Sequence, residues 1–187
     1  MLISYWSGQM ILNDLSVNAC QPITYTGDGR LILTRSQYLA LKNFLQLGGK
    51  IDGGKMSVDK VVYSVGNQFF NHCPRKVTWV GNNSYWVLNM SAKDQLRYAL
   101  QIGGYSLYDF NSKLKYFSTM TGFSRWNCNV EELVTHEREL LSFFRALLFK
   151  PKGVVLDNVD CNSQQIRALI EDIESVGVVS IPLEVCV

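Results

Sequence analysis

The sequence contains no apolar run of the roughly 18 residues that a membrane-spanning helix requires. Its most apolar stretch, Leu140 to Phe149, is interrupted by Arg145. The first residues, Met1 to Trp6, lack the basic start and the long apolar core of a secretory signal. We therefore expect a soluble or peripheral protein that has no membrane span and resides in an intracellular, reducing compartment.

A strong excess of charge of one sign is also absent. The 18 Lys and Arg residues against 16 Asp and Glu give a formal net charge of +2, and no long basic run occurs. Because binding to a phosphate backbone needs concentrated positive charge, we do not expect a nucleic-acid partner. The five cysteines, Cys20, Cys73, Cys128, Cys161 and Cys186, are far apart and form no C-x-x-C pair. That spacing favours free thiols over a disulfide framework.

What remains is the composition of a folded domain. With 187 residues, 47% of them apolar and 18% charged, the chain can bury a substantial core, and residues 1–187 are expected to form one domain. Alternating strand and helix patterns predict a mostly parallel sheet flanked by helices. The expected strands are 10–17, 29–34, 58–65, 76–80, 153–156 and 176–183, and the expected helices 36–47, 91–100 and 163–175, with a further helix before Lys150.

The segment from Leu133 to Asp160 is the most informative. Leu140, Leu141, Phe144, Leu147 and Leu148 recur at helical spacing. The sequence Lys150-Pro151-Lys152 then ends the helix, and the apolar run 153–156 predicts a buried strand. This strand delivers Asp157 to its carboxyl end, which is the edge where open α/β sheets bind their ligands.

The order of these residues resembles the C-terminal part of an ABC-transporter nucleotide-binding domain. There, a signature loop opens a helix ending in Arg-Ala-Leu-Leu, matched by 145–148, and Pro-Lys and the Walker B strand follow. Residues 77–100 look like the family's Q-loop segment, 11–17 like its opening strand and 49–54 like the turn after its first helix. The resemblance implies a P-loop-NTPase-like α/β fold with a reduced helical subdomain at about 101–145, related to the cytochrome c maturation ATPase subunit.

The family's phosphate-binding loop needs G-x-x-x-x-G-K-[ST], in which glycines let backbone N–H groups reach the phosphates and Lys neutralises them. No such motif occurs in the sequence. One register aligns Gly29, Thr34, Arg35 and Ser36 with the motif. The other takes 29–34 as the preceding strand and the loop as deleted before Ser36. The second register is favoured because the apolar residues 31–33 suit a strand better than a phosphate loop.

The other motif positions have also changed. By the resemblance, Asn158 stands where a carboxylate would activate water, Asn83 where the Q-loop glutamine would lie, and no His follows the last strand. The signature loop falls on 133–137, with Val134 for Ser and Thr135-His136 for the glycines. Ser36, Asn83, Asp157 and Asn158 are therefore the degenerate remnants of the site, and we expect no catalytic residue, metal or cofactor.

Three other groups of residues in the sequence could form a site. Asp157 alone could hold Mg²⁺, although a strand-end residue that caps a neighbouring helix or turn is the simpler expectation. His136 with Cys128 or Glu137 could form a nucleophile–base set, but no local pattern supports it. The aromatic residues Trp79, Tyr85 and Trp86 could stack on a base, whereas packing at the edge of the core is the more common cause.

The preferred hypothesis is a catalytically inactive ABC-ATPase-like domain, not an enzyme, that serves as a structural or docking subunit of a membrane-associated complex. Its partners would be protein subunits, including membrane subunits, with a mitochondrial complex as one option. The alternative is an ATP-binding subunit of an ABC-type transporter or cytochrome c maturation complex, in which a partner supplies the missing catalytic residues. A third hypothesis is an unrelated α/β enzyme of small substrates.

Overall fold

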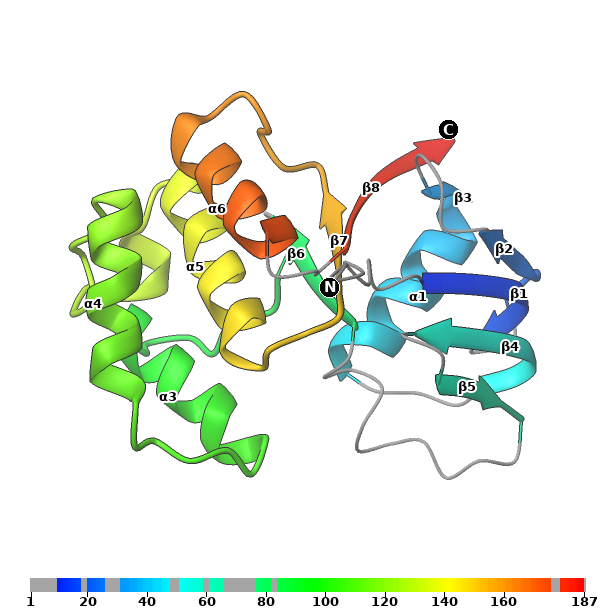
Figure 1. Cartoon of the computed structure of the whole chain (residues 1–187), viewed down its shortest axis with the longest axis horizontal. Coiled ribbons are helices and arrows are strands. Elements are labelled where there is room, and N and C mark those ends of the chain that lie inside the picture. Colours follow the sequence, from blue (N-terminus) through cyan, green and yellow to red (C-terminus); the bar gives the residue numbers. More distant parts are fainter. Residues whose placement is uncertain are drawn as a thin grey trace, which may run out of the picture.

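The computed structural model describes residues 10–17, 20–25, 31–47, 51–58, 61–65, 77–81, 84–175 and 179–186. The elements are β1 (Met10–Val17), β2 (Ile23–Tyr25), β3 (Leu31–Thr34), α1 (Arg35–Leu47), β4 (Ile51–Val58), β5 (Val61–Ser64), β6 (Val77–Gly81), α3 (Ala92–Ile102), α4 (Phe110–Thr121), η1 (Val130–Glu132), α5 (Thr135–Leu148), β7 (Gly153–Asp157), α6 (Gln164–Ser175) and β8 (Val179–Cys186). Figure 1 shows α3 to α6 gathered at one end of the molecule and α1 with β1 to β5 at the other.

The described strands form two four-stranded sheets. One has the order β2-β1-β4-β5 and is antiparallel throughout. The other has the order β3-β8-β7-β6 and is parallel throughout. All the connections in the parallel sheet require crossovers, which the helices provide.

Strand β7 shows how the layers are built. All five of its residues are buried, so it lies in the middle of the fold. Val155 packs in a core with α1 and both sheets, whereas Val154 and Leu156 pack in a second core with the helices α3 to α6. Since successive side chains of a strand point to opposite faces, Asp157 lies on the same side as Val155, toward α1.

Most of the predicted elements are confirmed. The helices predicted at 36–47, 91–100 and 163–175 appear as α1, α3 and α6, with ends shifted by one or two residues. Ser91 caps α3 as expected, because its Oγ accepts a hydrogen bond of 3.1 Å from the Asp94 N–H. The mostly parallel sheet and the P-loop-NTPase-like fold class are confirmed in β3-β8-β7-β6. The stretch 101–145 carries α4, η1 and most of α5, and its standing as a reduced subdomain stays a prediction.

The prediction is wrong in the N-terminal sheet. Residues 51–54, expected in a turn, begin β4, where Gly53 pairs with Ser16 of β1. The single strand expected at 58–65 is the end of β4 followed by β5, joined as a hairpin at Val58 and Val61. Strand β2 was not predicted. Glycines are poor strand residues, so pairing with β1 overrides the local preference here.

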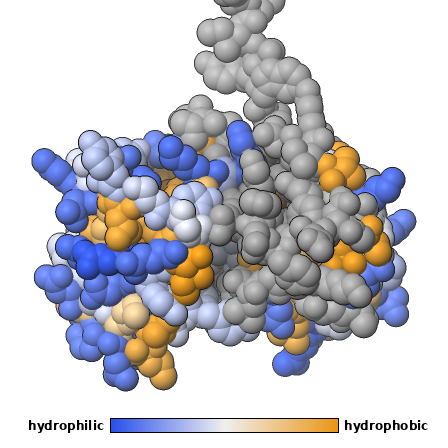
Figure 2. Space-filling model, turned by 90° about the horizontal axis from the view of Figure 1, so that it is seen from below, coloured by the Kyte–Doolittle hydropathy of each residue, from blue (hydrophilic) through white to orange (hydrophobic). Residues whose placement is uncertain are grey.

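In the described part of the chain, no helix is long and apolar enough to cross a membrane. The surface is nevertheless not uniformly polar. Figure 2 shows separate apolar patches between hydrophilic side chains on the helical half of the molecule. The large apolar side chains exposed on α3 and on the segment that precedes it are Tyr85, Val87, Leu88, Tyr98 and Ile102.

Candidate functional site

The carboxyl edge of the parallel sheet is organised around Asp157, the last residue of β7. Its side chain is only 5% exposed. Oδ2 accepts a hydrogen bond of 2.8 Å from the Tyr38 hydroxyl and one of 3.1 Å from Nε1 of Trp79. A buried carboxylate needs such donors, and here one comes from α1 and the other from β6. Within the described residues, the bonds to the Asp157 side chain thus come from two other side chains and not from the backbone N–H groups of a helix or turn.

The alternation of β6 and β7 explains this contact. Trp79 and Asp157 both point to the α1 side of the sheet, and Tyr38 lies on the first turn of α1. The Tyr38 and Trp79 rings meet edge to face, with centroids 5.6 Å apart. Trp79 is 97% buried by this packing, so it belongs to the core and offers no open face to a base.

The start of α1 follows β3 directly. Thr34 is the last residue of β3 and Arg35 the first of α1, so residues 31–34 form a strand as the favoured register predicts, while Gly29 lies outside the described residues. The sequence Thr34-Arg35-Ser36-Gln37 forms a capping box: the Thr34 N–H donates to Gln37 Oε1 at 2.9 Å, and the Gln37 N–H donates to Thr34 Oγ1 at 3.4 Å. Ser36 is exposed, and its Oγ lies 3.2 Å from Thr34 Oγ1.

Two serines hold the end of β6 against α5. The Gly81 N–H donates to Ser142 Oγ at 3.3 Å, Ser84 Oγ donates to the Gly81 carbonyl at 2.9 Å, and the two hydroxyls lie 2.7 Å apart. At Gly81 the chain passes so close to Asp157 that an added Cβ would lie 2.4 Å from its carbonyl oxygen. The close approach of β6 to β7 at this edge thus depends on glycine.

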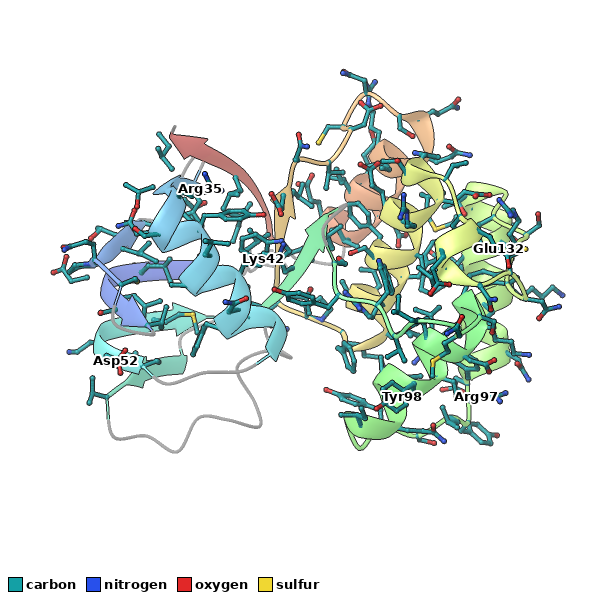
Figure 3. All side chains as sticks on the ribbon, turned by 180° about the vertical axis from the view of Figure 1, so that it is seen from behind. Arg35, Lys42, Asp52, Arg97, Tyr98 and Glu132 are labelled. Carbon is teal, nitrogen blue, oxygen red and sulfur yellow. The ribbon has the colours of Figure 1, made fainter. Side chains whose placement is uncertain are left out.

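A buried cation lies beside this edge. Lys42 of α1 is only 7% exposed, and its Nζ lies 5.6 Å from the ring centroids of both Tyr38 and Tyr85. Figure 3 shows Lys42 on α1, next to the strands of the parallel sheet. Tyr38 and Lys42 are four residues apart and therefore lie on one face of the helix. The Tyr85 hydroxyl also donates to Asn43 Oδ1 at 3.1 Å, so α1 contacts the segment after β6 at two points.

Arg145 anchors that same segment from the other side. Its guanidinium donates to the Tyr85 carbonyl at 2.6 Å and stacks on the Trp86 ring, with Cζ 4.2 Å from the centroid. Burial lowers the pKa of Arg145 to about 10, so the group stays charged at neutral pH. Gln95 of α3 also fixes this segment. Its side chain accepts a hydrogen bond of 3.2 Å from the Val87 N–H and donates one to the Val87 carbonyl.

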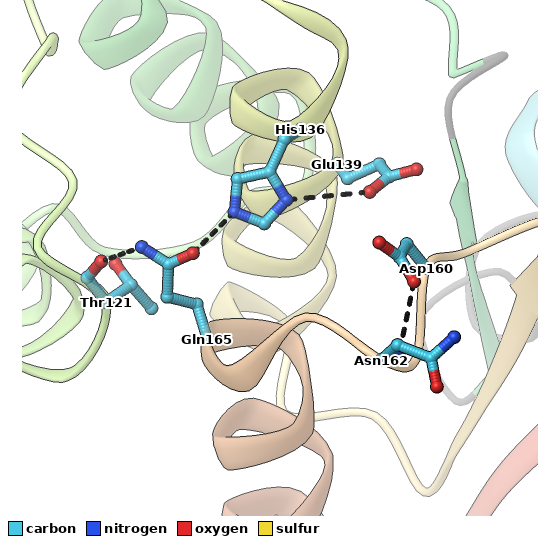
Figure 4. Close-up of polar contacts among 6 residues, drawn as sticks. All are labelled: Thr121, His136, Glu139, Asp160, Asn162 and Gln165. Atoms are coloured by element: carbon cyan, nitrogen blue, oxygen red, sulfur yellow. Dashed lines mark hydrogen bonds and ion pairs between the residues drawn. The ribbon is translucent and has the colours of Figure 1, made fainter.

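The residues around the start of α5 do not assemble into a nucleophile–base set. Figure 4 shows His136 Nε2 bonded to Gln165 Oε1 at 2.7 Å, with Nδ1 at 3.9 Å from Glu139. Because the Gln165 amide donates to the Thr121 carbonyl, its oxygen faces His136 and the ring donates from Nε2. Glu137 instead accepts from Arg125 and from the Val134 N–H.

Of the predicted remnants, Ser36 and Asp157 lie at this edge. Asn158 follows Asp157, is exposed and has φ of 49°, a conformation that asparagine tolerates better than most residues. Asn83 lies outside the described residues. Sequence reasoning missed Tyr38, Lys42 and Arg145; the spacing of Tyr38 and Lys42 on α1 is the one signal in the sequence that could have indicated the first two.

Comparison with solved structures decides the fold. An ATP-binding subunit of an ABC transporter matches with a TM-score of 0.70 and 14% identity, over 94% of this chain and 79% of the other. CbiO1 from Clostridium perfringens, part of the ABC transporter complex CbiONQ, matches with a TM-score of 0.67 and 13% identity, over 95% and 78%. The chain has the ABC ATPase fold. No protein-family model matches the sequence, and no curated protein matches it either.

A third ABC ATPase structure corrects one expectation. The dimeric ATP-binding cassette MJ0796 in a post-hydrolysis state, bound to ADP and Pi, matches with a TM-score of 0.69 and 14% identity, over 94% of this chain and 87% of the other. Chains with this ABC ATPase fold are thus found as ATP-binding subunits and after hydrolysis, and the prediction that this chain is not an enzyme is wrong. That prediction counted the lost motif residues and did not consider which other polar side chains the fold places at the same edge.

The edge offers a ligand for the magnesium ion of a bound nucleotide but, within the described residues, no loop for its phosphates. Asp157 and the Tyr38 hydroxyl offer oxygen atoms from β7 and α1, the two elements from which P-loop NTPases hold Mg²⁺. Within the described stretch 31–47, by contrast, no residue separates β3 from α1, so no glycine loop wraps a phosphate there. Among the described residues no group of three or more His, Cys, Asp or Glu side chains could hold a metal ion, so Asp157 offers one carboxylate, and the other ligands of the ion and the phosphate cradle have to come from elsewhere.

Proposed function

We propose that the chain is an ABC-type ATP-binding subunit of a membrane-associated transport complex, and that a partner subunit supplies the nucleotide-contacting residues it lacks. The observation that carries the proposal is the pairing of Asp157 with a hydroxyl on the first turn of α1, at the carboxyl edge of the parallel sheet. In P-loop NTPases a hydroxyl from this helix and the Walker B aspartate hold the metal.

A partner is needed because of the start of α1. The capping box of Thr34 and Gln37 uses two of the N–H groups that a phosphate would otherwise meet. The remaining donors for a triphosphate therefore come from outside the described residues or from a second subunit.

Docking to membrane subunits is the second half of the proposal. The segment 84–90 and helix α3 carry exposed apolar side chains, and Arg145 and Gln95 hold this surface in a fixed conformation. Large exposed apolar patches commonly mark interaction sites. That CbiO1 is part of a transporter complex supports the same assignment.

The test compares the chain alone with the chain in its native complex, recovered by co-purification. Thermal unfolding is followed with and without millimolar ATP and Mg²⁺, since a ligand of the folded state raises the unfolding temperature. We expect the complex to be stabilised and to hydrolyse ATP, and Asp157→Asn to reduce both effects. Asp160→Asn, at an exposed turn residue, is the matched control and should leave them unchanged. A complex that neither binds nor hydrolyses ATP would refute the proposal.

A further inference from the structure

A recess with a volume of about 550 Å³ lies away from the Asp157 edge. It is formed by α4, α6, the end of α5 and the segment that joins α5 to β7. That segment enters the amino end of β7, whereas Asp157 stands at the carboxyl end. The recess is therefore separate from the proposed nucleotide site.

The wall of the recess combines an apolar floor with basic residues. Phe117 and Ile173 are almost completely buried and form the floor together with Leu147. Lys113 comes from α4, and Lys150 and Lys152 come from the segment after α5.

The basic residues outnumber the acidic ones. Against these three lysines the lining contains one carboxylate, Asp172, which already accepts a hydrogen bond of 2.9 Å from the Tyr116 hydroxyl. Among the residues that the structure describes, no ion pair joins Lys113 or Lys150 to an acidic side chain. The recess therefore carries positive charge beside apolar surface.

The backbone conformation at Lys150 is one that lysine rarely adopts, so the occurrence of a lysine at this position calls for a reason. Helix α5 ends at Leu148, and Lys150 follows the C-cap residue Phe149 with φ of 49°. This position after a helix is usually glycine, because a side chain in the left-handed conformation costs about 1 kcal/mol. A lysine thus occupies a position where glycine would be more stable.

We propose that this recess binds a small organic anion with an apolar body, an aryl or acyl carboxylate. The apolar part would lie against Phe117, Leu147 and Ile173, and the carboxylate would lie near Lys113 and Lys150. Pockets for small ligands commonly have volumes of about 300–1,000 Å³, an apolar lining and few polar groups. The volume of the recess lies in this range, and most of the surface that lines it is apolar.

Isothermal titration of the full chain tests the chemistry with three probes: phenylbutanoate, its neutral isostere phenylbutanamide, and inorganic phosphate. We expect phenylbutanoate to bind and both other probes to bind on the order of tenfold more weakly. The amide lacks the negative charge, and phosphate lacks the apolar body. Equal binding of the amide, equal binding of phosphate, or no heat from phenylbutanoate at millimolar concentration would overturn the proposal.

Two substitutions locate the site. Lys150→Gly should keep or raise the stability of the chain while weakening phenylbutanoate binding on the order of threefold, and Lys113→Met should weaken it similarly. Lys115→Met, on the same helix but outside the recess, is the matched control and should bind like the parent. Unchanged binding in both Lys113 and Lys150 variants would rule this recess out as the site.

Discussion

The Tyr38 hydroxyl donates a hydrogen bond of 2.8 Å to Oδ2 of Asp157, across 119 residues of sequence. This bond joins the first turn of α1 to the last residue of β7, the two elements that meet at the carboxyl edge of the parallel sheet. The Trp79 indole donates to the same oxygen atom. The carboxylate is therefore held in one orientation by two neutral donors from different elements.

Removing the Tyr38 hydroxyl should weaken this junction without disrupting the core. For Tyr38→Phe we expect the free energy of unfolding to fall by about 1–3 kcal/mol, as is typical for a hydrogen bond to a charged group. Urea denaturation measures it. Tyr108→Phe is the control, because Tyr108 is 93% exposed, and its stability should match the parent. Equal stability of the two variants would show that the bond contributes nothing.

Gly81 should tolerate no side chain. A Cβ at this position would lie 2.4 Å from the Asp157 carbonyl oxygen, a backbone atom that cannot rotate away. We expect Gly81→Ala to destabilise the chain by about 1–3 kcal/mol or more, because overpacking forces the strands apart. At Gly53 a Cβ would meet only an ordinary contact of 3.6 Å with Ser16. Gly53→Ala should be close to neutral in the same denaturation experiment, and a similar loss in both variants would contradict the steric explanation.

Arg145 should control the mobility of the segment after β6. Arg145→Met keeps an apolar stem but removes the donor to the Tyr85 carbonyl and the cation above Trp86. We expect a loss of about 1–3 kcal/mol and faster amide hydrogen exchange over residues 84–90. Arg167→Met, at an exposed position on α6, should change neither. Unchanged exchange in the Arg145 variant would mean that other contacts fix the segment.

The titration of Tyr116 should make the stability of the folded chain depend on pH only in alkaline solution. Burial and the bond to Asp172 raise the pKa of Tyr116 in the folded state, so the folded chain keeps a proton that the unfolded chain loses. The stabilisation is fully present below the unfolded-state pKa of about 10 and is lost as the pH rises through the raised folded-state pKa. Because the side chain is nearly half exposed, the effect should be a few tenths of a kcal/mol.

Urea midpoints of the parent and Tyr116→Phe at several pH values measure this effect. The difference between the two proteins should stay constant from about pH 7 to 9.5, and the parent should then lose its advantage. A difference that changes below about pH 9 would contradict the assignment to Tyr116.

The sequence predicted the parallel sheet well because its elements carry their own signals. The helix of Leu140 and Phe144 has apolar residues at helical spacing, and the strand 153–157 is a continuous apolar run, so both could be located without tertiary information. The antiparallel sheet was harder to predict. Gly53 and Gly54 argue locally for a turn, and only the pairing of β4 with β1 makes them strand residues.

The site was predicted less completely than the fold. Asp157 could be found because it ends a strand at the edge where ligands bind. Tyr38 and Lys42 share only the weak signal of their spacing on α1, and Arg145 has none, since aromatic and basic residues are common on amphipathic helices. Their contacts depend on how α1 and α5 pack against the sheet. Motif loss in the sequence therefore gave a misleading prediction about enzymatic function.

The indole of Trp79 gives the molecule an internal optical probe. Its emission depends on the polarity and charge around Nε1, and that atom bonds directly to Asp157. Any cation that draws the carboxylate away would change the environment of a chromophore that is otherwise shielded from water. Metal and nucleotide titrations can thus be followed by intrinsic fluorescence without labelling the chain, and Trp79→Phe identifies which part of the signal comes from this edge.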